Sequence, residues 1–269
     1  MPLLWLRVAL VFYGLGLVYA LLTLTGRARA LARITMPAIG VGVVFHFVSL
    51  VEATMASGHL TPASIYHSES LLAFLIMGFF LAVWLRYQTS APGIFVFPLV
   101  FLLTLFAAVG QQPPEFDSPL LHSGWVWTHI TLIFAGYAAL FLSFAASLLY
   151  LLQERSLKSR REGVFSRLPA LEVLDEIGYR SLLLGFPFMT LGLAAGSVIA
   201  GERFGAAFLL DPKTLLSLVL WALYMVLLYT RWSAGWRGRR AAFLSAAGFV
   251  VAVSAWAANY FSEVHRILP

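Results

Sequence analysis

The chain has 269 residues, of which 61% are hydrophobic and only 11% are charged, and its mean hydropathy is +0.87. Soluble domains are about 45–50% apolar, so this composition excludes an ordinary soluble domain and predicts an integral membrane protein. The net charge of +6 is confined to a few connections, so we interpret it as a topology signal and not as a sign of nucleic-acid binding. The absence of cysteine excludes disulfides, thiol-redox chemistry and Fe–S ligation.

Apolar runs of about 18 residues or more predict membrane-spanning helices, and the chain contains eight of them. In chain order they are Leu3–Thr25, Met36–Ser57, Tyr66–Tyr87, Gly93–Gly110, Gly124–Leu152, Tyr179–Ala200, Leu215–Thr230 and Ala241–Phe261. The first run lacks the basic start and the cleavage site of a signal peptide, so we expect a retained helix. The predicted fold class is therefore all-α: a polytopic membrane protein, with a bundle of eight transmembrane helices forming a single integral membrane domain over residues 1–269.

The basic residues predict the orientation of these helices. Fourteen of the 18 lysines and arginines fall in alternate connections, namely 26–35, 86–92, 153–180 and 231–240. The positive-inside rule makes these connections cytoplasmic and both termini extracytoplasmic. The charged loop 153–180 is the only sizeable cytoplasmic segment, and we expect an amphipathic helix over Leu168–Tyr179. The connection from Gly201 to Lys213 is expected to be an outer loop.

Histidine is costly inside a bilayer, so the six histidines are the first candidates for function. His122, Trp125 and His129 are spaced i, i+3 and i+7, which places them on one face of a helix. His129 would lie just inside the membrane near the outer interface, where apolar walls suit a porphyrin with its propionates in water. The alternative is an interfacial tryptophan belt with incidental histidines.

Two further histidines leave alternatives open. His265 follows the last helix on the same outer side, so it and His129 could reach opposite faces of one flat ligand, or His265 is simply solvated. His46 lies in mid-span, where it either bonds to a neighbouring helix or serves as a ligand or relay. Glu52 and Glu69 are either its partners or caps at the outer helix ends.

Two local patterns predict structure. Asp211 before Pro212 is typical of a helix N-cap with proline in the first turn. Gly185, Pro187, Gly192 and Gly196 predict a close helix contact or a kink in the sixth span. Neither pattern alone indicates chemistry, and the chain has no phosphate-binding loop, zinc-protease motif or nucleophile elbow.

From about residue 40 onward the sequence resembles the cytochrome c assembly family of the CcsA and CcmC type. Its matching segments are Ser57-Gly-His-Leu-Thr-Pro-Ala-Ser-Ile-Tyr-His-Ser-Glu-Ser-Leu, Leu121-His-Ser-Gly-Trp-Val-Trp-Thr-His-Ile, the Leu171-Glu-x-Leu-Asp-Glu region, Asp211-Pro-Lys213 with Trp221, and Trp236-Arg-Gly-Arg-Arg. In that family the outer histidines that flank a tryptophan-rich segment are axial haem ligands, and the resemblance implies that these are His129 and His265. His59 and Glu69 align with a further motif without an assigned role.

The chain also departs from the family pattern. The tryptophan-rich run WGxYWxWDPKE is replaced by Phe-Gly-Ala-Ala-Phe-Leu-Leu-Asp-Pro-Lys-Thr, and the histidine expected late in the seventh span is replaced by Tyr229. This degenerate version is similar to the HemX-type branch. The resemblance therefore implies two functions: haem handling at the outer face in cytochrome c assembly, or regulation of tetrapyrrole synthesis through the loop 153–180 without stable haem. A third alternative is a proton-coupled transporter that uses His46 and Glu52.

The first of these functions sets our expectations for the site. The resemblance implies haem b, held non-covalently by His129 and His265, with the apolar walls Trp125, Trp127, Phe204 and Phe208 and with Lys213 as a propionate partner. The remaining candidate cofactor-binding residues are His122, His59, His46 and Asp211. The expected partners are haem, an assembly protein, apocytochrome c and the lipid bilayer, and the expected location is the bacterial cytoplasmic membrane. We expect no enzyme activity from the chain alone, but membership of a haem-attachment (cytochrome c synthase) system.

Overall fold

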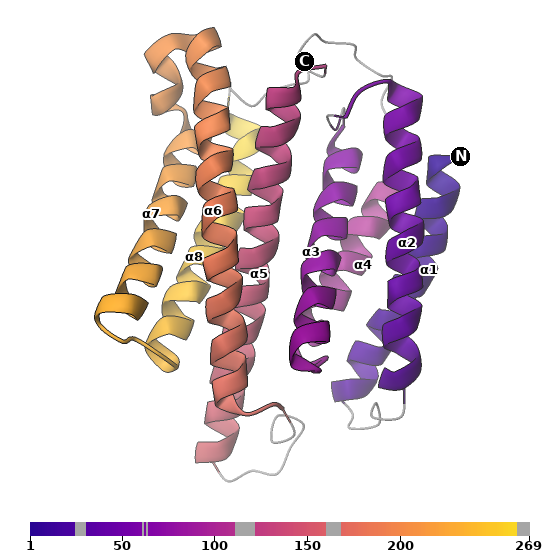
Figure 1. The fold of residues 1–269 in the computed structure, drawn as a ribbon, viewed down its shortest axis with the longest axis vertical. Helices are drawn as coiled ribbons and strands as arrows, with labels where there is room; N and C mark the ends of the chain where they lie inside the picture. Colours follow the sequence, from indigo (N-terminus) through magenta and orange to yellow (C-terminus); the bar gives the residue numbers. More distant parts are fainter. Residues whose placement is uncertain (25–30, 61, 63, 111–121, 160–167, 263–269) are drawn as a thin grey trace. The chain divides into compact units, whose positions relative to one another are not determined.

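The computed structural model describes residues 1–24, 31–60, 62, 64–110, 122–159 and 168–262, and the described part is helical. Figure 1 shows the elements in chain order. They are α1 (Pro2–Leu24), α2 (Ala32–Ser57), α3 (Ile65–Tyr87), α4 (Gly93–Val109), α5 (Gly124–Lys158), α6 (Leu171–Phe204), the 3-10 helix η2 (Gly205–Leu210), α7 (Pro212–Ser233), α8 (Arg239–Ala257) and the 3-10 helix η3 (Ala258–Phe261).

The length and composition of these helices confirm the predicted fold class. Within the described residues, seven helices are long and apolar enough to cross a membrane, and the eighth, α4, is an apolar helix of 17 residues. Seventeen residues lie at the lower limit for a spanning helix. The chain is therefore an all-α, multi-pass membrane protein, whereas the extracytoplasmic placement of its termini stays a prediction.

The described residues form two compact units. Unit 1 comprises Met1–His122 and Leu152–Val173, and unit 2 comprises Ser123–Leu151 and Leu174–Pro269. The first contains α1 to α4, and the second contains most of α5 together with α6, α7, α8 and the two 3-10 helices. The prediction of a single membrane domain over residues 1–269 stays a prediction.

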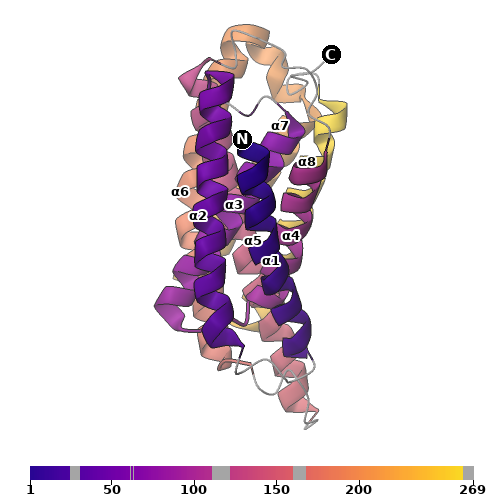
Figure 2. The same cartoon turned by 90° about the vertical axis from the view of Figure 1, so that its right-hand side faces the viewer.

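In unit 1, α1 packs along α2 and α4, and α3 packs on α4 (Figure 2). Phe80 and Phe97 meet edge to face in the core, with ring centroids 5.0 Å apart. Small residues permit the close approach of α1 and α2, since a Cβ atom at Gly42 would lie 2.7 Å from Phe12. The core of this unit therefore depends on glycines that face aromatic rings.

In unit 2, α5 and α6 approach each other through glycines from both helices. A Cβ atom at Gly136 of α5 would lie 3.3 Å from the backbone nitrogen of Met189, and one at Gly185 of α6 would lie 2.8 Å from Ala139. This confirms the predicted close contact of the sixth span. The core that these helices share with α7 and α8 contains Leu140, Leu182, Leu220, Tyr224 and Ala252.

The predicted connection 153–180 is helical at both ends, of which only the second was expected to be a helix. Helix α5 continues to Lys158, and α6 begins at Leu171, so the expected amphipathic helix Leu168–Tyr179 is the first part of a helix that runs on into the membrane span. The charged residues do not end these helices because they pair at i, i+4 spacing: Glu154 with Lys158, and Glu176 with Arg180, each at 2.7 Å.

The expected outer loop Gly201–Lys213 is also mostly helical. Its first residues belong to α6, which ends at Phe204, and the next six form η2. Gly205 adopts a positive φ of 55°, which lets the chain change from α-helix to 3-10 helix at that point. The loop prediction was wrong because alanine, phenylalanine and leucine at 206–210 continue a helical backbone after Gly205, and no turn residue interrupts them before Asp211.

Candidate functional site

His129 lies half-buried in the second turn of α5, and α6 fixes its ring. Its Nδ1 atom is 2.7 Å from the backbone carbonyl oxygen of Gly192. A carbonyl oxygen can only accept, so the hydrogen must be on Nδ1 and the ring donates it to Gly192. The neutral imidazole then carries its lone pair on Nε2, which is the atom that can bind a metal.

Glycines on α6 make the space that this ring occupies. A Cβ atom at Gly196 would lie 2.5 Å from Cε1 and 2.6 Å from Nδ1 of His129, closer than real Cβ contacts come. A Cβ atom at Gly192 would lie 2.9 Å from the side chain of Ile133, on the same side of α5. Gly196 therefore makes a cradle for the imidazole of His129 that any larger residue would fill, while the missing side chain of Gly192 leaves room for Ile133.

The N-terminus of α7 lies near this ring. Asp211 is 7% exposed, and its Oδ1 atom accepts from the backbone N–H groups of Lys213 and Thr214, with Pro212 in the first turn. The predicted N-cap is confirmed. Lys213 interacts electrostatically with both Asp211 and His129.

Ser262, the residue after η3, also joins this cluster. Its hydroxyl lies 2.9 Å from Oδ1 and 2.8 Å from Oδ2 of Asp211, and Ser262 itself is 2% exposed. The sequence analysis did not single out Ser262, because nothing local marks a serine 51 residues away from its partner. His265, three residues further on, lies outside the described residues.

Apolar side chains are exposed around this end of unit 2. Trp125 is 61% exposed and Trp127 is half-buried. The 3-10 helix η2, which replaces the tryptophan-rich segment, buries none of its six residues, and Phe208 within it is half-buried. Phe204, at the end of α6, is exposed as well. These side chains leave an apolar surface beside the N-terminus of α7.

Trp221 is placed differently from the other candidate aromatics. Its Nε1–H donates to Thr190 Oγ1 at 3.0 Å, and its ring stacks on Phe186 with centroids 5.9 Å apart. Both partners belong to α6, so Trp221 joins α7 to α6 inside the unit. Its role in the structure is to hold two helices together.

The other candidate histidines belong to unit 1. His46 is fully buried, and its two ring nitrogens lie 3.2 Å from Tyr13 Oη and 2.9 Å from Ser70 Oγ. This geometry favours the structural alternative for His46. Glu52 accepts from Trp5 Nε1 at 3.0 Å, which makes it a partner of α1.

His59 and His122 lie together at one end of unit 1. Their rings meet edge to face with centroids 5.5 Å apart. His122 is exposed and His59 is half-buried. The structure thus brings these two candidates together although they are 63 residues apart in the chain.

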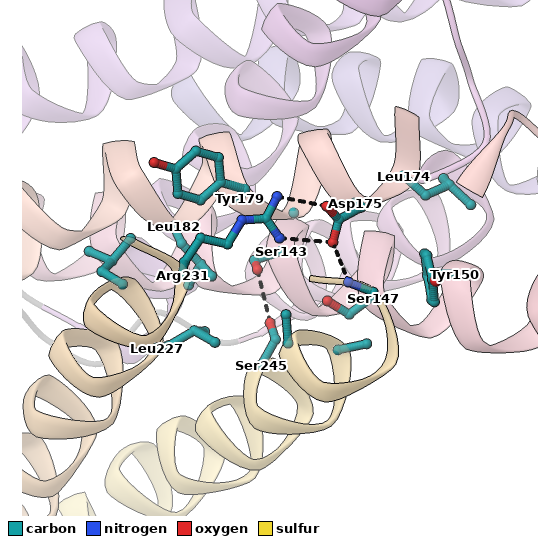
Figure 3. Close-up of a pocket in the computed structure, with 15 residues that line it drawn as sticks. Ser143, Ser147, Tyr150, Leu174, Asp175, Tyr179, Leu182, Leu227, Arg231 and Ser245 are labelled. Carbon is teal, nitrogen blue, oxygen red and sulfur yellow. Dashed lines mark hydrogen bonds and ion pairs between the residues drawn. The ribbon is translucent and has the colours of Figure 1, made fainter. Parts of the chain in front are cut away.

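At the other end of unit 2, where α6 begins and α7 ends, a small cavity surrounds an ion pair that the sequence analysis did not predict (Figure 3). Arg231 donates to both carboxylate oxygens of Asp175 at 2.8 and 2.7 Å, and its guanidinium lies 4.4 Å from the ring centre of Tyr179. The backbone N–H of Gly238 also donates to Asp175. The cavity has a volume of about 20 Å³, room for about one water molecule. Asp175 therefore holds together α6, α7 and the turn before α8.

Comparison with known proteins identifies the family. The model of the family "Cytochrome C assembly protein" matches residues 63–264. The chain is 30% identical over 238 residues to the cytochrome c biogenesis protein CcsA of Chlamydomonas reinhardtii, covering 84% of this chain and 64% of that protein. It is 32% identical over 235 residues to CcsA of Prochlorococcus marinus strain MED4, covering 77% of this chain and 74% of that protein.

A third relative, CcsA of Guillardia theta, is 30% identical over 218 residues, which cover 72% of this chain and 71% of the relative. The chain thus spans slightly less than two thirds of the Chlamydomonas protein and about seven tenths of the other two. No solved structure gives a significant match. Because the family model covers most of the sequence, including α3 to α8, the chain belongs to the cytochrome c assembly protein family.

Proposed function

We propose that this protein binds b-type haem non-covalently at the end of unit 2 where α5 begins, and that it acts there in cytochrome c assembly. His129 supplies one axial nitrogen and His265 supplies the other. The site faces the outer side of the bacterial cytoplasmic membrane. There the protein presents haem to apocytochrome c or to an assembly partner, without being an enzyme by itself.

The tautomer of His129 is the observation that carries this proposal. Histidines that bind metals generally donate their second ring N–H to a backbone carbonyl or a carboxylate, which orients the ring and raises the basicity of the ligand nitrogen. His129 makes this bond to Gly192 at 2.7 Å. The bond therefore orients the ring and leaves the lone pair on Nε2 of His129, so that this nitrogen can act as a metal ligand.

The set of donors at this end favours haem over a bare metal ion. Among the described residues there is no group of three or more histidine, cysteine, aspartate or glutamate side chains that could hold a metal ion. A metalloporphyrin already brings four in-plane nitrogens, so the protein needs to add only axial ligands. One oriented histidine within the described residues, with a second from the C-terminal segment, suits that requirement.

The surroundings of His129 fit the rest of such a ligand. Trp127 and Phe208 offer apolar surface for a porphyrin plane, and both are half-buried, so part of each side chain remains accessible. The amine of Lys213 lies within electrostatic reach of His129, where it would pair with a propionate. Two nitrogen ligands would give six-coordinate iron whose potential is tuned by burial.

The role in cytochrome c assembly rests on the relatives. Those compared above are all described as cytochrome c biogenesis proteins, and the match includes the segments around His129 and Asp211. The chain keeps Asp211-Pro212-Lys213 while it lacks the tryptophans of the resembled pattern. We therefore assign it haem binding and presentation and leave bond formation to a partner.

Absorption spectra of the purified protein test this proposal, in the oxidised and dithionite-reduced forms. The wild type should show a sharp reduced α-band and about one haem per chain, and the double variant His129→Ala/His265→Ala should lose both. His67→Ala is the matched control, because His67 is a half-buried histidine at the start of α3 in unit 1, and it should keep the wild-type spectrum. A colourless wild type that also fails to take up added haem would overturn the site and favour the regulator hypothesis.

A further inference from the structure

The turn between α7 and α8 carries an exposed group of positive charges. Its three exposed arginines, called the arginine surface below, are Arg237, Arg239 and Arg240. The sequence from Pro212 to Ser262 contains no aspartate or glutamate, so neither of the two helices that the turn joins supplies a negative charge to this surface.

The neighbouring cations at this end of unit 2 are compensated, and these three are not. Arg231 pairs with Asp175, and Arg180 pairs with Glu176, each at 2.7 Å. Among the described residues, no carboxylate forms an ion pair with any member of the arginine surface. Three like charges within four positions repel one another, and an anion bound between them would relieve that repulsion.

The backbone of the turn is held in place by hydrogen bonds within unit 2. The N–H of Trp236 donates to the carbonyl oxygen of Thr230 at 3.1 Å, and the N–H of Gly238 donates to Asp175 at 2.9 Å. Gly238 has a positive φ of 62°, and a Cβ atom there would lie 2.5 Å from the hydroxyl of Tyr150. The arginine surface therefore stands on a turn whose shape is set before any ligand binds.

Aromatic rings accompany two of these arginines. The guanidinium of Arg240 lies 5.8 Å from the ring centre of Trp236, and that of Arg239 lies 5.5 Å from the ring centre of Phe243. Trp232, at the end of α7, is exposed. Tryptophan is enriched where a protein crosses the headgroup region of a membrane. Because α7 and α8 are both long and apolar enough to span, the turn that joins them is expected at that level.

We propose that the arginine surface binds the phosphate headgroup of an anionic phospholipid. Guanidinium groups bind phosphate oxygens in pairs, and a turn between two spanning helices has lipid headgroups as its immediate neighbours. The predicted orientation places this turn at the cytoplasmic leaflet, whose anionic lipids attract basic segments close to a span. The proposal goes beyond the haem site and is independent of it, since no residue of the arginine surface belongs to that site.

Native mass spectrometry of the full-length protein in detergent tests the proposal. Equimolar phosphatidylglycerol and phosphatidylcholine are added, and the ratio of the two bound lipids measures the preference for the anionic headgroup. Each basic residue near a membrane surface contributes about fivefold to such a preference, so three contribute roughly a hundredfold. The wild type should therefore retain phosphatidylglycerol, and the triple variant Arg237→Gln/Arg239→Gln/Arg240→Gln should lose up to roughly a hundredfold of the preference.

Two single variants keep the test decisive if the triple variant does not fold. Arg240→Gln leaves two cations in the turn and should lower the preference about fivefold. Arg180→Gln is the matched control, because Arg180 is an exposed arginine at the same end of unit 2 whose charge Glu176 already compensates. It should keep the wild-type ratio. If Arg240→Gln keeps that ratio as well, the arginine surface does not bind the lipid and the proposal is overturned.

Charge and source of the phosphate are tested separately. The variant Arg237→Lys/Arg239→Lys/Arg240→Lys keeps all three positive charges, so its preference for phosphatidylglycerol should stay within about fivefold of the wild type. Millimolar inorganic phosphate should not displace the lipid, and displacement would make free phosphate the ligand and overturn the lipid assignment. A wild type that retains both lipids equally would also overturn it, and an acidic segment of a protein partner would then be the occupant to test.

Discussion

Replacing Gly196 by alanine tests the proposed haem site without removing any group that would bond to haem. The new Cβ atom would lie 2.5 Å from Cε1 of His129, and ordinary contact begins at 3.4 Å, so the ring or the helix must move by about 0.9 Å. Metal–ligand distances tolerate deviations of only about 0.2 Å. The same atom would lie 2.6 Å from Nδ1, which threatens the hydrogen bond to Gly192.

We therefore expect Gly196→Ala to weaken haem binding at least 10–100-fold, the range found when a metal-binding histidine loses its orienting partner. The assay is titration of haem into haem-free protein in detergent, followed by Soret absorption. Alanine is favoured over glycine in a helix by about 1 kcal/mol, which offsets part of the about 1–3 kcal/mol that such overpacking costs, so a loss of binding has to be separated from a loss of stability. The melting temperature of the variant checks this point.

Gly201→Ala is the matched control. Gly201 belongs to the same helix, but a Cβ atom there would meet only Phe208, at an ordinary distance of 3.9 Å. It should bind haem like the wild type. If Gly196→Ala also binds haem with wild-type affinity and spectrum, then the cradle does not orient His129 and the reasoning from its tautomer is refuted.

Two further predictions concern buried polar contacts, one within unit 2 and one within unit 1. Asp175→Asn should lower the free energy of unfolding by roughly 3 kcal/mol. This is the low end of the range for a buried pair, because the side chains of Arg231 and Asp175 keep 10% and 16% exposure. Glu176→Gln, in the exposed pair with Arg180, should lower it by less than about 1 kcal/mol. Thermal unfolding in detergent measures the loss of stability in both variants. Equal losses would contradict the description of Arg231 and Asp175 as a buried ion pair. His46→Ala should lower the melting temperature, because it leaves two buried hydroxyls without their imidazole partner, but it should not change the haem content per chain. Loss of haem at an unchanged melting temperature would instead make His46 a ligand or relay.

The long helices could be predicted well from the sequence, because a membrane-spanning helix requires one property above all, a sufficiently long apolar run. Spanning helices need about 20 apolar residues, and this demand alone located the seven described helices that are long enough to span as well as the shorter α4. The same argument failed beyond the membrane, because hydropathy says nothing about where a polar helix ends. Helix α5 continues to Lys158 and α6 starts at Leu171 because side-chain pairs four residues apart stabilise the exposed turns.

In the candidate site too, the sequence was sufficient for local contacts and insufficient for contacts between distant residues. The N-cap at Asp211 follows from local chemistry, so the sequence was sufficient to predict it. The partners of His129 and Asp211 lie 63 and 51 residues away, at Gly192 and Ser262, and such pairs depend on how two helices align in three dimensions. The Arg231–Asp175 pair spans 56 residues and was missed for the same reason.

These contacts explain which part of the resembled motif the chain could lose. Tryptophans that line a porphyrin supply apolar area, and phenylalanine or leucine supplies less of it, so under the proposed function their replacement in η2 would lower haem affinity without dismantling the fold. Asp211 cannot be exchanged in this way. Its one carboxylate caps α7 and holds Ser262 in a buried place, and an apolar residue there would leave two backbone N–H groups and a hydroxyl without their acceptor. The hydrogen bonds of Asp211 therefore explain why Asp-Pro-Lys is present beside a changed aromatic segment. The carboxylate is needed for the structure of the site, whereas the apolar residues next to it can be exchanged for one another.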